Sequence, residues 1–315
     1  SFFPQLFAGP IVRAKEFLPQ FKLDKKFDWD RFNSGTGQMV WGFFKKIVVA
    51  DSLAPFIDQC FAAPETFSSM HLMVGVIFYS FQIYCDFSAY SDIAIGTARV
   101  MGYDLMENFR TPYHSKSIRE FWQRWHISLS TWFRDYVYIP LGGNRVVKWR
   151  WYYNLWLTFL VSGLWHGANW TFVLWGALHG FYLVFAIVIE PYKNRMYNQM
   201  PFRFGETMTN WYNTVTTFIL VCFAWIFFRA NNIQDAGLLI YNSFQLNLSQ
   251  LNLNMFAKNS EAELIFSILF IGFMEMIQLL LKGQRIEVLL AQKPILVRWW
   301  AYALFVNLII YFGVF

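Results

Sequence analysis

The sequence contains few charged residues and few cysteines. Only 15% of its 315 residues are Asp, Glu, Lys or Arg, compared with about 25% in soluble globular proteins. Its three cysteines, Cys60, Cys85 and Cys222, form no CxxC pair, so they indicate neither a disulfide framework nor a zinc ribbon. The spacings GxGxxG, GxxxxGK[ST] and GxSxG are absent as well. These absences argue against the common soluble nucleotide-binding and hydrolase motifs.

Apolar residues are abundant instead. They make up 56% of the chain, and aromatic residues alone make up 21%. No Asp, Glu, Lys or Arg occurs from Trp151 to Ile189. One membrane-spanning helix needs about 20 apolar residues, so this run can form two spans, or one span and a re-entrant segment. The composition therefore predicts an all-α, polytopic membrane protein.

Several further segments are apolar enough for membrane helices. We expect spans or part-spans at residues 70–85, 151–164, 170–189, 211–228, 262–281 and 298–315. The apolar segment 38–61 contains Lys45 and Lys46, which we expect to snorkel to a membrane edge. The net charge is +6, and in a membrane protein such an excess of Lys and Arg usually lies in cytoplasmic loops. We therefore predict no nucleic-acid partner.

Residues 116–150 are the most informative polar stretch. They are rich in Lys and Arg, which favours the cytoplasmic side. From Ile118 to Tyr136 the apolar residues fall at helical spacing, and His126 lies at the edge of that stripe. The pattern predicts one amphipathic helix in or entering the membrane interface. Arg134 is a candidate for contact with an anionic group such as a phosphate.

Three of the five histidines are candidates for chemistry or for structural roles. His166 lies in the middle of the uncharged run, where a neutral imidazole suits a general base, but a structural hydrogen bond to a carbonyl is an equal alternative. His126 lies among hydroxyl and charged side chains, although an ordinary interfacial face would look the same. His179 is expected to be structural or to line a pocket. No histidine has a partner at metal-ligand spacing, so we expect no metal site.

Asp86 and Asp92 lie near the expected membrane depth. Such carboxylates serve as proton-relay groups in transporters, or they have structural roles, in which they cap helices or pair with a cation such as Arg99. Both readings are open at this point, and the first favours a transporter or channel.

Four motifs, in the same order, resemble the membrane-bound O-acyltransferase family, and within it the bacterial alginate O-acetyltransferase branch. They are PQLFAGPIVR (Pro4–Arg13), YCDFSAYSDIAIG (Tyr84–Gly96), FWQRWHISLSTWFRDYVYIPLGGNR (Phe121–Arg145) and SGLWHGANWTFVLWGALHG (Ser162–Gly180). The resemblance covers roughly residues 1–245. It implies a helical bundle with interfacial or re-entrant helices around a central tunnel.

The resemblance also implies a site and its substrates. The catalytic histidine of the family matches His166, and the second motif histidine of this branch matches His126. We expect neighbouring side chains to bind substrate, namely Trp125, Ser130, Arg134, Asp135, Trp165 and Asn169. The family uses an acyl thioester donor, commonly acetyl-CoA in this branch, and no permanently bound cofactor. The implied acceptor is a hydroxyl of an exported polysaccharide such as alginate, reached with an extracytoplasmic partner protein.

The expected protein is therefore an O-acetyltransferase in the bacterial inner membrane, with residues 1–315 forming a single membrane-embedded domain. The alternatives are a transporter or channel of a polysaccharide export system, D-alanyl transfer to a cell-wall polymer, or a structural membrane subunit. Because the chain starts just before the first motif and stops in an apolar run, we expect further family helices before Ser1 and a tail after Phe315.

Overall fold

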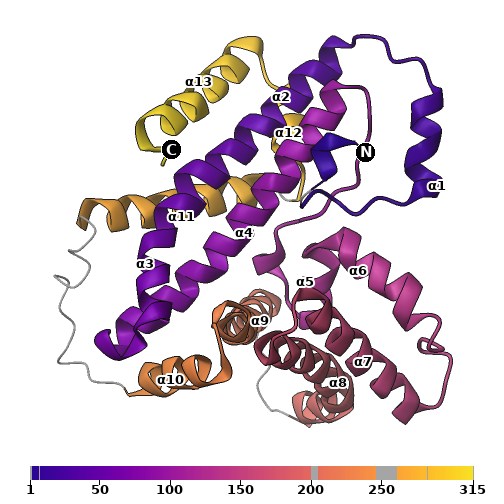
Figure 1. Ribbon diagram of the computed structural model, residues 1–315, viewed down its shortest axis with the longest axis vertical. Coiled ribbons are helices and arrows are strands. Elements are labelled where there is room, and N and C mark those ends of the chain that lie inside the picture. Colours follow the sequence, from indigo (N-terminus) through magenta and orange to yellow (C-terminus); the bar gives the residue numbers. More distant parts are fainter. Residues whose placement is uncertain (1, 7, 200–204, 246–260, 282, 315) are drawn as a thin grey trace. The chain divides into compact units, whose positions relative to one another are not determined.

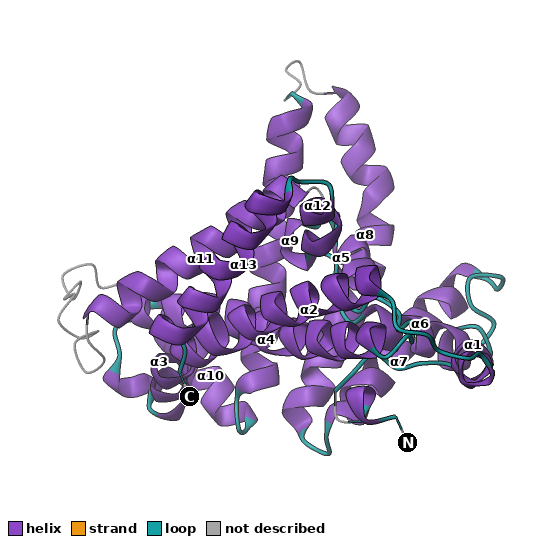
Figure 2. Cartoon of the chain, turned by 90° about the horizontal axis from the view of Figure 1, so that it is seen from above, coloured by secondary structure: helices purple, strands orange, loops and turns teal. Residues whose placement is uncertain are grey.

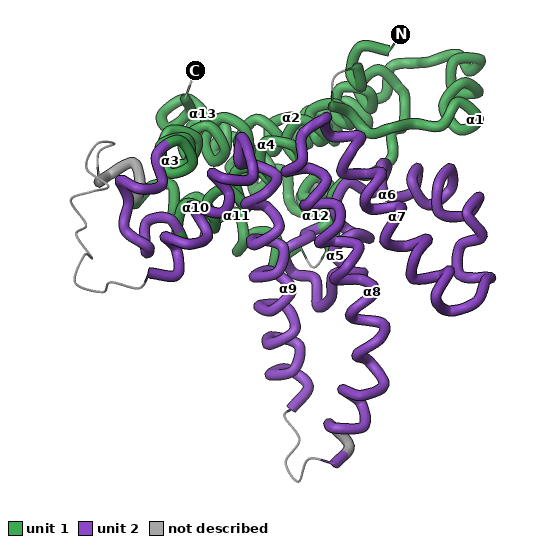
Figure 3. The backbone as a smooth tube through the Cα atoms, turned by 60° about the horizontal axis from the view of Figure 1, so that its bottom comes forward, with its two compact units in different colours: residues 1–62, 73–110, 247–315 green, residues 63–72, 111–246 purple. Residues whose placement is uncertain are grey.

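The computed structural model describes residues 2–6, 8–199, 205–245, 261–281 and 283–314, and within these ranges it contains helices and no strands (Figure 1). The all-α prediction is confirmed. The chain divides into two compact units, residues 1–62, 73–110 and 247–315, and residues 63–72 and 111–246 (Figure 3). Each unit is described by itself, and the single domain expected over residues 1–315 stays a prediction.

The first unit, unit 1, is built mainly from long helices. Asp28 caps the helix that begins at Trp29, because its Oδ1 accepts hydrogen bonds from the backbone N–H groups of Asp30 and Arg31. Its helices are α1 (Ala14–Phe17), α2 (Trp29–Phe43), the π-helical turn η3 (Phe44–Ala50), α3 (Asp51–Ala62), α4 (Ser69–Val100, of which residues 73–100 belong here), α11 (Glu261–Leu281), α12 (Ile286–Ala291) and α13 (Ile295–Phe312).

Glycines let α2 and α4 approach closely in unit 1. A Cβ at Gly35 of α2 would collide with the carbonyl oxygen of Gly96 on α4. A Cβ at Gly42 of α2 would collide with Ile93, which also lies on α4. Phe44 of η3 is fully buried and packs its ring against Phe270 and Phe305. Helices α2, η3, α4, α11 and α13 therefore share one apolar core.

Lys45, one of the two lysines of η3, differs from the prediction. Lys45 is buried, and its Nζ lies 2.6 Å from Asp92 Oδ2 and 2.6 Å from Ser88 Oγ. Lys46 Nζ lies 2.7 Å from Asp86 Oδ1 and 2.8 Å from Asp51 Oδ1. The expected snorkelling of Lys45 is thus wrong, because the Asp92 carboxylate and the Ser88 hydroxyl on α4 satisfy its charge inside the unit. Arg99 pairs with Glu287 at 2.9 Å, and not with the α4 aspartates.

The second unit, unit 2, contains the two motifs with His126 and His166. Its helices are α5 (Ile118–Arg124), α6 (Ile127–Phe133) followed by the π-helical turn η6 (Arg134–Tyr138), α7 (Lys148–His166), α8 (Trp170–Gln199), α9 (Glu206–Arg229) and α10 (Ile233–Phe244). Helices α8 and α9 run side by side, as Figures 2 and 3 show.

Helices α7 and α8 form a tightly packed pair. A Cβ at Gly163 would collide with the carbonyl oxygen of Phe172, and a Cβ at Gly176 would collide with that of Phe159. Small residues at such positions allow membrane helices to approach closely. The glycine pairs of SGLWHG and WGALHG are therefore explained by helix packing, which brings the end of α7 against the start of α8.

The amphipathic segment is not one continuous helix. Residues Ile118–Arg124 and Ile127–Phe133 form α5 and α6, and the chain breaks at Trp125 and His126 between them. His126 has a left-handed backbone, with φ 44°, a conformation that is uncommon for residues other than glycine. The periodicity was compatible with one helix, but this backbone conformation ends α5 and redirects the chain.

Among the described residues, four helices are long and apolar enough to cross a membrane: Ser69–Val100, Trp170–Met196, Glu206–Arg229 and Ile295–Phe312. These correspond to the spans expected at 70–85, 170–189, 211–228 and 298–315. The segments expected at 151–164 and 262–281 are helical too, in α7 and α11, but they fall outside this set.

Candidate functional site

His166 is the last residue of α7, beside the loop that leads into α8. Its ring is partly buried among aromatic side chains from two other helices. The ring centroid lies 5.2 Å from that of Trp175 on α8 and 5.1 Å from that of Phe228 on α9. Within the described part of the chain, no hydrogen bond occupies the His166 imidazole, so its nitrogens are available to a bound molecule.

His126 lies at the break between α5 and α6, and only 5% of its surface is exposed. Its Nδ1 lies 3.5 Å from Ser128 Oγ. Burial, with a smaller contribution from nearby His166, lowers the pKa of His126 to about 3. The ring is therefore neutral at physiological pH. His166, which is far from His126 in the sequence, lies near enough in unit 2 to contribute to this pKa shift.

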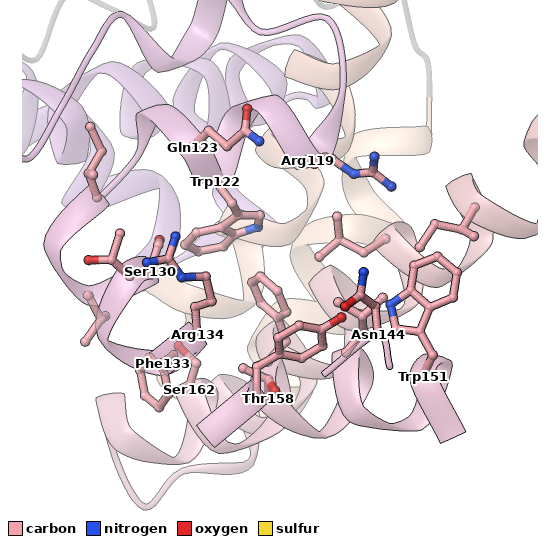
Figure 4. A pocket seen from close by; sticks show the side chains of 18 residues that line it. Arg119, Trp122, Gln123, Ser130, Phe133, Arg134, Asn144, Trp151, Thr158 and Ser162 are labelled. Carbon is pink, nitrogen blue, oxygen red and sulfur yellow. The ribbon is translucent and has the colours of Figure 1, made fainter. Parts of the chain in front are cut away.

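A cavity of about 700 Å³ lies between α5, α6, η6, α7 and α8 (Figure 4). Its charged lining residues are Arg119 of α5 and Arg134 of η6. Helices α5, α6 and α7 each contribute both polar and apolar side chains, and α8 contributes apolar ones. The lining residues are Arg119, Trp122, Gln123, Ile127, Leu129, Ser130, Thr131, Phe133, Arg134, Tyr138, Asn144, Trp151, Leu155, Thr158, Phe159, Ser162, Leu183 and Ile187. Figure 4 shows Trp122 between the side chains of Arg119 and Arg134.

Of the six side chains expected to bind substrate, Ser130 and Arg134 line this cavity. Arg134 Nε also donates to Asp135 Oδ1 at 2.7 Å, so Asp135 orients the guanidinium from outside the lining. Two cations, Arg119 and Arg134, and an apolar interior suit a ligand with an anionic head and an apolar tail.

The other three lie elsewhere. Trp125 is buried, stacks on Phe121 and packs at a tilt against Trp225. Trp165 is exposed beside His166. Asn169 donates to the Asn231 carbonyl at 2.8 Å and accepts from the Thr171 N–H at 3.1 Å, so its side chain holds the start of α8. Their roles in substrate binding stay predictions.

The sequence did not single out several residues around the histidines. Trp175 and Trp225 are buried at the centre of unit 2, and Trp122 joins them to the cavity wall. One signal was available for Trp175, because it lies four residues before His179 and so shares a helix face with it. The sequence carries no comparable signal for Trp225, because this residue lies on α9 and meets α8 only in the folded chain.

No metal centre is formed by the described residues, in which no group of three or more His, Cys, Asp or Glu side chains is suitably placed. The chemistry available at the site is that of imidazole, indole, hydroxyl and guanidinium groups.

The helical fold and the long apolar helices define a class, that of all-α membrane proteins. Residues 1–233 match the model of MBOAT, the membrane-bound O-acyltransferase family, and the chain belongs to this family. The resemblance of the four motifs is confirmed. Together with its apolar helices, this membership makes it a membrane protein.

Individual relatives show which kinds of acyltransferase the chain is similar to. The chain is 42% identical to the probable alginate O-acetylase AlgI of Pseudomonas putida over 276 residues, which cover 87% of this chain and 54% of the relative. It is 44% identical to the peptidoglycan O-acetyltransferase of Helicobacter pylori, over 75% of this chain and 44% of the relative. It is 29% identical to the teichoic acid D-alanyltransferase of Bacillus subtilis, over 72% of this chain and 59% of the relative. The chain thus spans about half the length of these relatives.

Proposed function

We propose that this chain is the core of an O-acyltransferase that moves an acetyl group from a thioester donor to hydroxyl groups of an exported polysaccharide. The observation that carries the proposal is a cavity with two arginines in the same unit as both motif histidines, of which His126 is buried and neutral. The family of the chain and the printed names of its relatives support the reaction class.

His166 acts as the general base. Its neutral ring removes the proton from the acceptor hydroxyl while the hydroxyl oxygen attacks the thioester carbonyl carbon. The carbonyl π electrons move to oxygen and form a tetrahedral oxyanion. When this intermediate collapses, the C–S bond breaks, and the thiolate takes the proton back from His166. The products are an ester and a free thiol, and the protein returns to its starting state.

His126 supports this step as a neutral ring. Its position at a strained backbone break places it inside the unit rather than on the surface. Since the ring stays neutral, it donates or accepts a hydrogen bond without adding charge near the imidazolium that forms on His166. Ser128, on the first turn of α6, supplies a hydroxyl group close to it.

Acetyl-CoA is the proposed donor, and the cavity is its proposed binding site. Arg119 and Arg134 meet its phosphates, and the apolar wall from α7 and α8 receives the pantetheine arm. Arg134 is more than half exposed and held by Asp135, so it can contact a charged headgroup at the cavity entrance. The other proposed substrate-binding side chains, around His166, are those of Trp125, Trp165 and Asn169.

The proposed location is the bacterial inner membrane, crossed several times, with the basic segment 116–150 facing the cytoplasm. The acceptor polysaccharide is then reached on the other face, with an extracytoplasmic partner protein that receives or delivers the acyl group. Transfer of D-alanine from a carrier protein is the second candidate, favoured by the likeness to the teichoic acid D-alanyltransferase.

The test is acyl transfer in vesicles that contain the purified protein. Labelled acetyl-CoA is added outside, and label in added alginate, in peptidoglycan fragments and in free acetate is counted. We expect wild-type protein to label a glycan and His166→Ala to lose about 10²–10⁴-fold of that rate. His114→Gln, a histidine outside the cavity and the aromatic core of unit 2, is the matched control and keeps the wild-type rate. Ion or polymer flux without any acyl donor, or a tenth or more of the activity left in His166→Ala, contradicts the proposal.

A further inference from the structure

Three buried side chains that carry N–H groups pack against one another, and one of them contacts the His166 ring. They belong to Trp175 and His179 on α8 and to Trp225 on α9, whose exposed fractions are 1%, 0% and 1%. The ring centroid of Trp175 lies 5.1 Å from that of His179 and 5.9 Å from that of Trp225. All three side chains belong to unit 2.

The tautomer of His179 follows from its neighbour. Trp122 Nε1 lies 3.2 Å from His179 Nδ1. An indole N–H can only donate, so Nδ1 accepts, and the neutral ring carries its proton on Nε2. His179 Nε2, Trp175 Nε1 and Trp225 Nε1 are therefore all donors. None of the three has an acceptor among the described residues.

Unsatisfied buried donors are rare, because each loses its hydrogen bond to water on folding. Three such donors in one cluster, with no acceptor from the chain, form an environment that complements an oxygen with free lone pairs. The same cluster joins the two parts of the proposed site. Trp175 contacts the His166 ring, while Trp122 and Phe159, which contact the His179 ring, line the cavity.

We propose that Trp175, His179 and Trp225 bind the carbonyl oxygen of the acyl donor and stabilise the oxyanion formed when the acceptor hydroxyl attacks. This inference rests on the proposed acyl transfer and adds a role for three side chains that the motif histidines do not explain. A donor that enters along the cavity passes Trp122 and Phe159 and presents its carbonyl between this cluster and His166. Preorganised N–H groups in a dry site act where the negative charge develops.

The first measurement uses the wild-type protein alone and needs no substitution. The probe is a ketone analogue of acetyl-CoA in which a methylene group replaces the sulfur, with ¹³C in the carbonyl group. This analogue keeps the carbonyl oxygen and cannot transfer its acyl group. We expect the infrared carbonyl stretch of the bound analogue to fall below its value in hexane at least as far as it falls in water. A bound analogue with a stretch near the hexane value overturns the inference.

The second measurement follows the donors themselves. Protein with ¹⁵N-labelled indole groups is titrated with the ketone and, as a matched ligand, with the S-ethyl thioether of CoA, which lacks the carbonyl oxygen. Trp175→Phe and Trp225→Phe assign the two N–H resonances, and Trp170→Phe, a largely exposed tryptophan, is the control. We expect both resonances to move downfield with the ketone and to stay in place with the thioether.

Two results of the titration contradict the inference. If the resonances are already downfield in the free protein and neither ligand moves them, the N–H groups donate hydrogen bonds to a resident water. Upfield resonances that no ligand moves assign them to aromatic ring faces.

Variants then connect binding to turnover. We expect Trp175→Phe, which removes the N–H and keeps an aromatic ring, to lower kcat by about 10²-fold with little change in KM for acetyl-CoA. His179→Gln, whose amide can still donate, should retain more activity than His179→Phe. An unchanged kcat in Trp175→Phe overturns the inference.

Failure of this inference is distinguishable from failure of the proposed function. If wild-type protein transfers acetyl groups but the bound ketone keeps its hexane-like stretch, only the carbonyl site is wrong. If the protein neither transfers acetyl groups nor binds the ketone, the proposed function is wrong, and the carbonyl site is wrong with it.

Discussion

The buried ion pair of unit 1 and the aromatic centre of unit 2 treat their polar groups in opposite ways. In unit 1, the ammonium group of Lys45 is matched by Asp92 and Ser88, and Gln38 Nε2 donates to Asp92 Oδ1 at 2.9 Å. In unit 2, the imidazoles and indoles around His166 include three donors without an acceptor from the described residues. A polar group that is already paired stabilises the fold, whereas one that is left unpaired is available to a substrate.

This difference also bears on the two open readings of the α4 aspartates. Asp86 and Asp92 each form an ion pair with a lysine of η3. Their side chains therefore hold η3 against α4, which is the cation-pairing alternative rather than a relay of unpaired carboxylates. The transporter alternative loses the sequence feature that favoured it.

The largest expected effect tests the paired side of the comparison. Asp92→Ala leaves the Lys45 ammonium group buried without its carboxylate, and we expect a loss of about 3 kcal/mol in the free energy of unfolding. Thermal and denaturant unfolding of the purified protein in detergent measure it. The control is the double variant Lys45→Met with Asp92→Leu, which removes both charges and should stay near wild-type stability. An Asp92→Ala protein as stable as the wild type would show that the pair is not structural.

The next effect concerns the packing that places His166. Gly176→Ala puts a methyl group against the Phe159 carbonyl oxygen on α7, and backbone cannot move away as a flexible side chain can. We expect a destabilisation of about 2–3 kcal/mol, together with lower acetyl transfer.

Gly237 on α10 is the matched control, since no atom lies within 4 Å of a Cβ built there. Gly237→Ala should be neutral or stabilising by about 0.5–1 kcal/mol, as expected for alanine in a helix. If both variants melt at the same temperature, α7 and α8 do not pack through these glycines.

A smaller effect is expected from pH. The folded pKa of His126, about 3, lies below the unfolded value of 6.5, so the unfolded state binds the proton more readily. Stability is then fully present above about pH 6.5 and is lost as the pH falls from there towards the folded pKa. Between about pH 7.5 and pH 5 the loss for this one group is about 2 kcal/mol.

The measurement is the change in Tm between these two pH values, for wild type and for His126→Asn. The variant should show the smaller change, because its side chain does not titrate. An equal change in both proteins would mean that His126 is not held neutral by burial.

The smallest effect is expected at the exposed end of the site. Arg134→Gln removes one cation from the cavity, and we expect KM for acetyl-CoA to rise about fivefold, or about 1 kcal/mol, with kcat little changed. Arg150→Gln is the control, since Arg150 lies over the Tyr153 ring and does not line the cavity. A fall in kcat without a change in KM would place Arg134 in the chemistry rather than in donor binding.

Much of the fold follows from local sequence patterns. The uncharged apolar runs predicted α4, α8, α9 and α13 as membrane-length helices, because the cost of burying charge in lipid leaves few alternatives. The assignment of the motif histidines His126 and His166 to the site stays a prediction. The one helix expected from Ile118 to Tyr136 was wrong, since periodicity reports a face and not a break in the backbone.

By itself the sequence determined an all-helical membrane protein of a recognisable family, with two histidines and a basic segment near them. These properties depend on residues close together in the chain. Only the tertiary structure decided that Lys45 pairs with Asp92, that His126 approaches His166, and that Trp225 joins Trp175 and His179. Each of these contacts joins helices far apart in the sequence, and helix packing, rather than local propensity, decides which side chains meet.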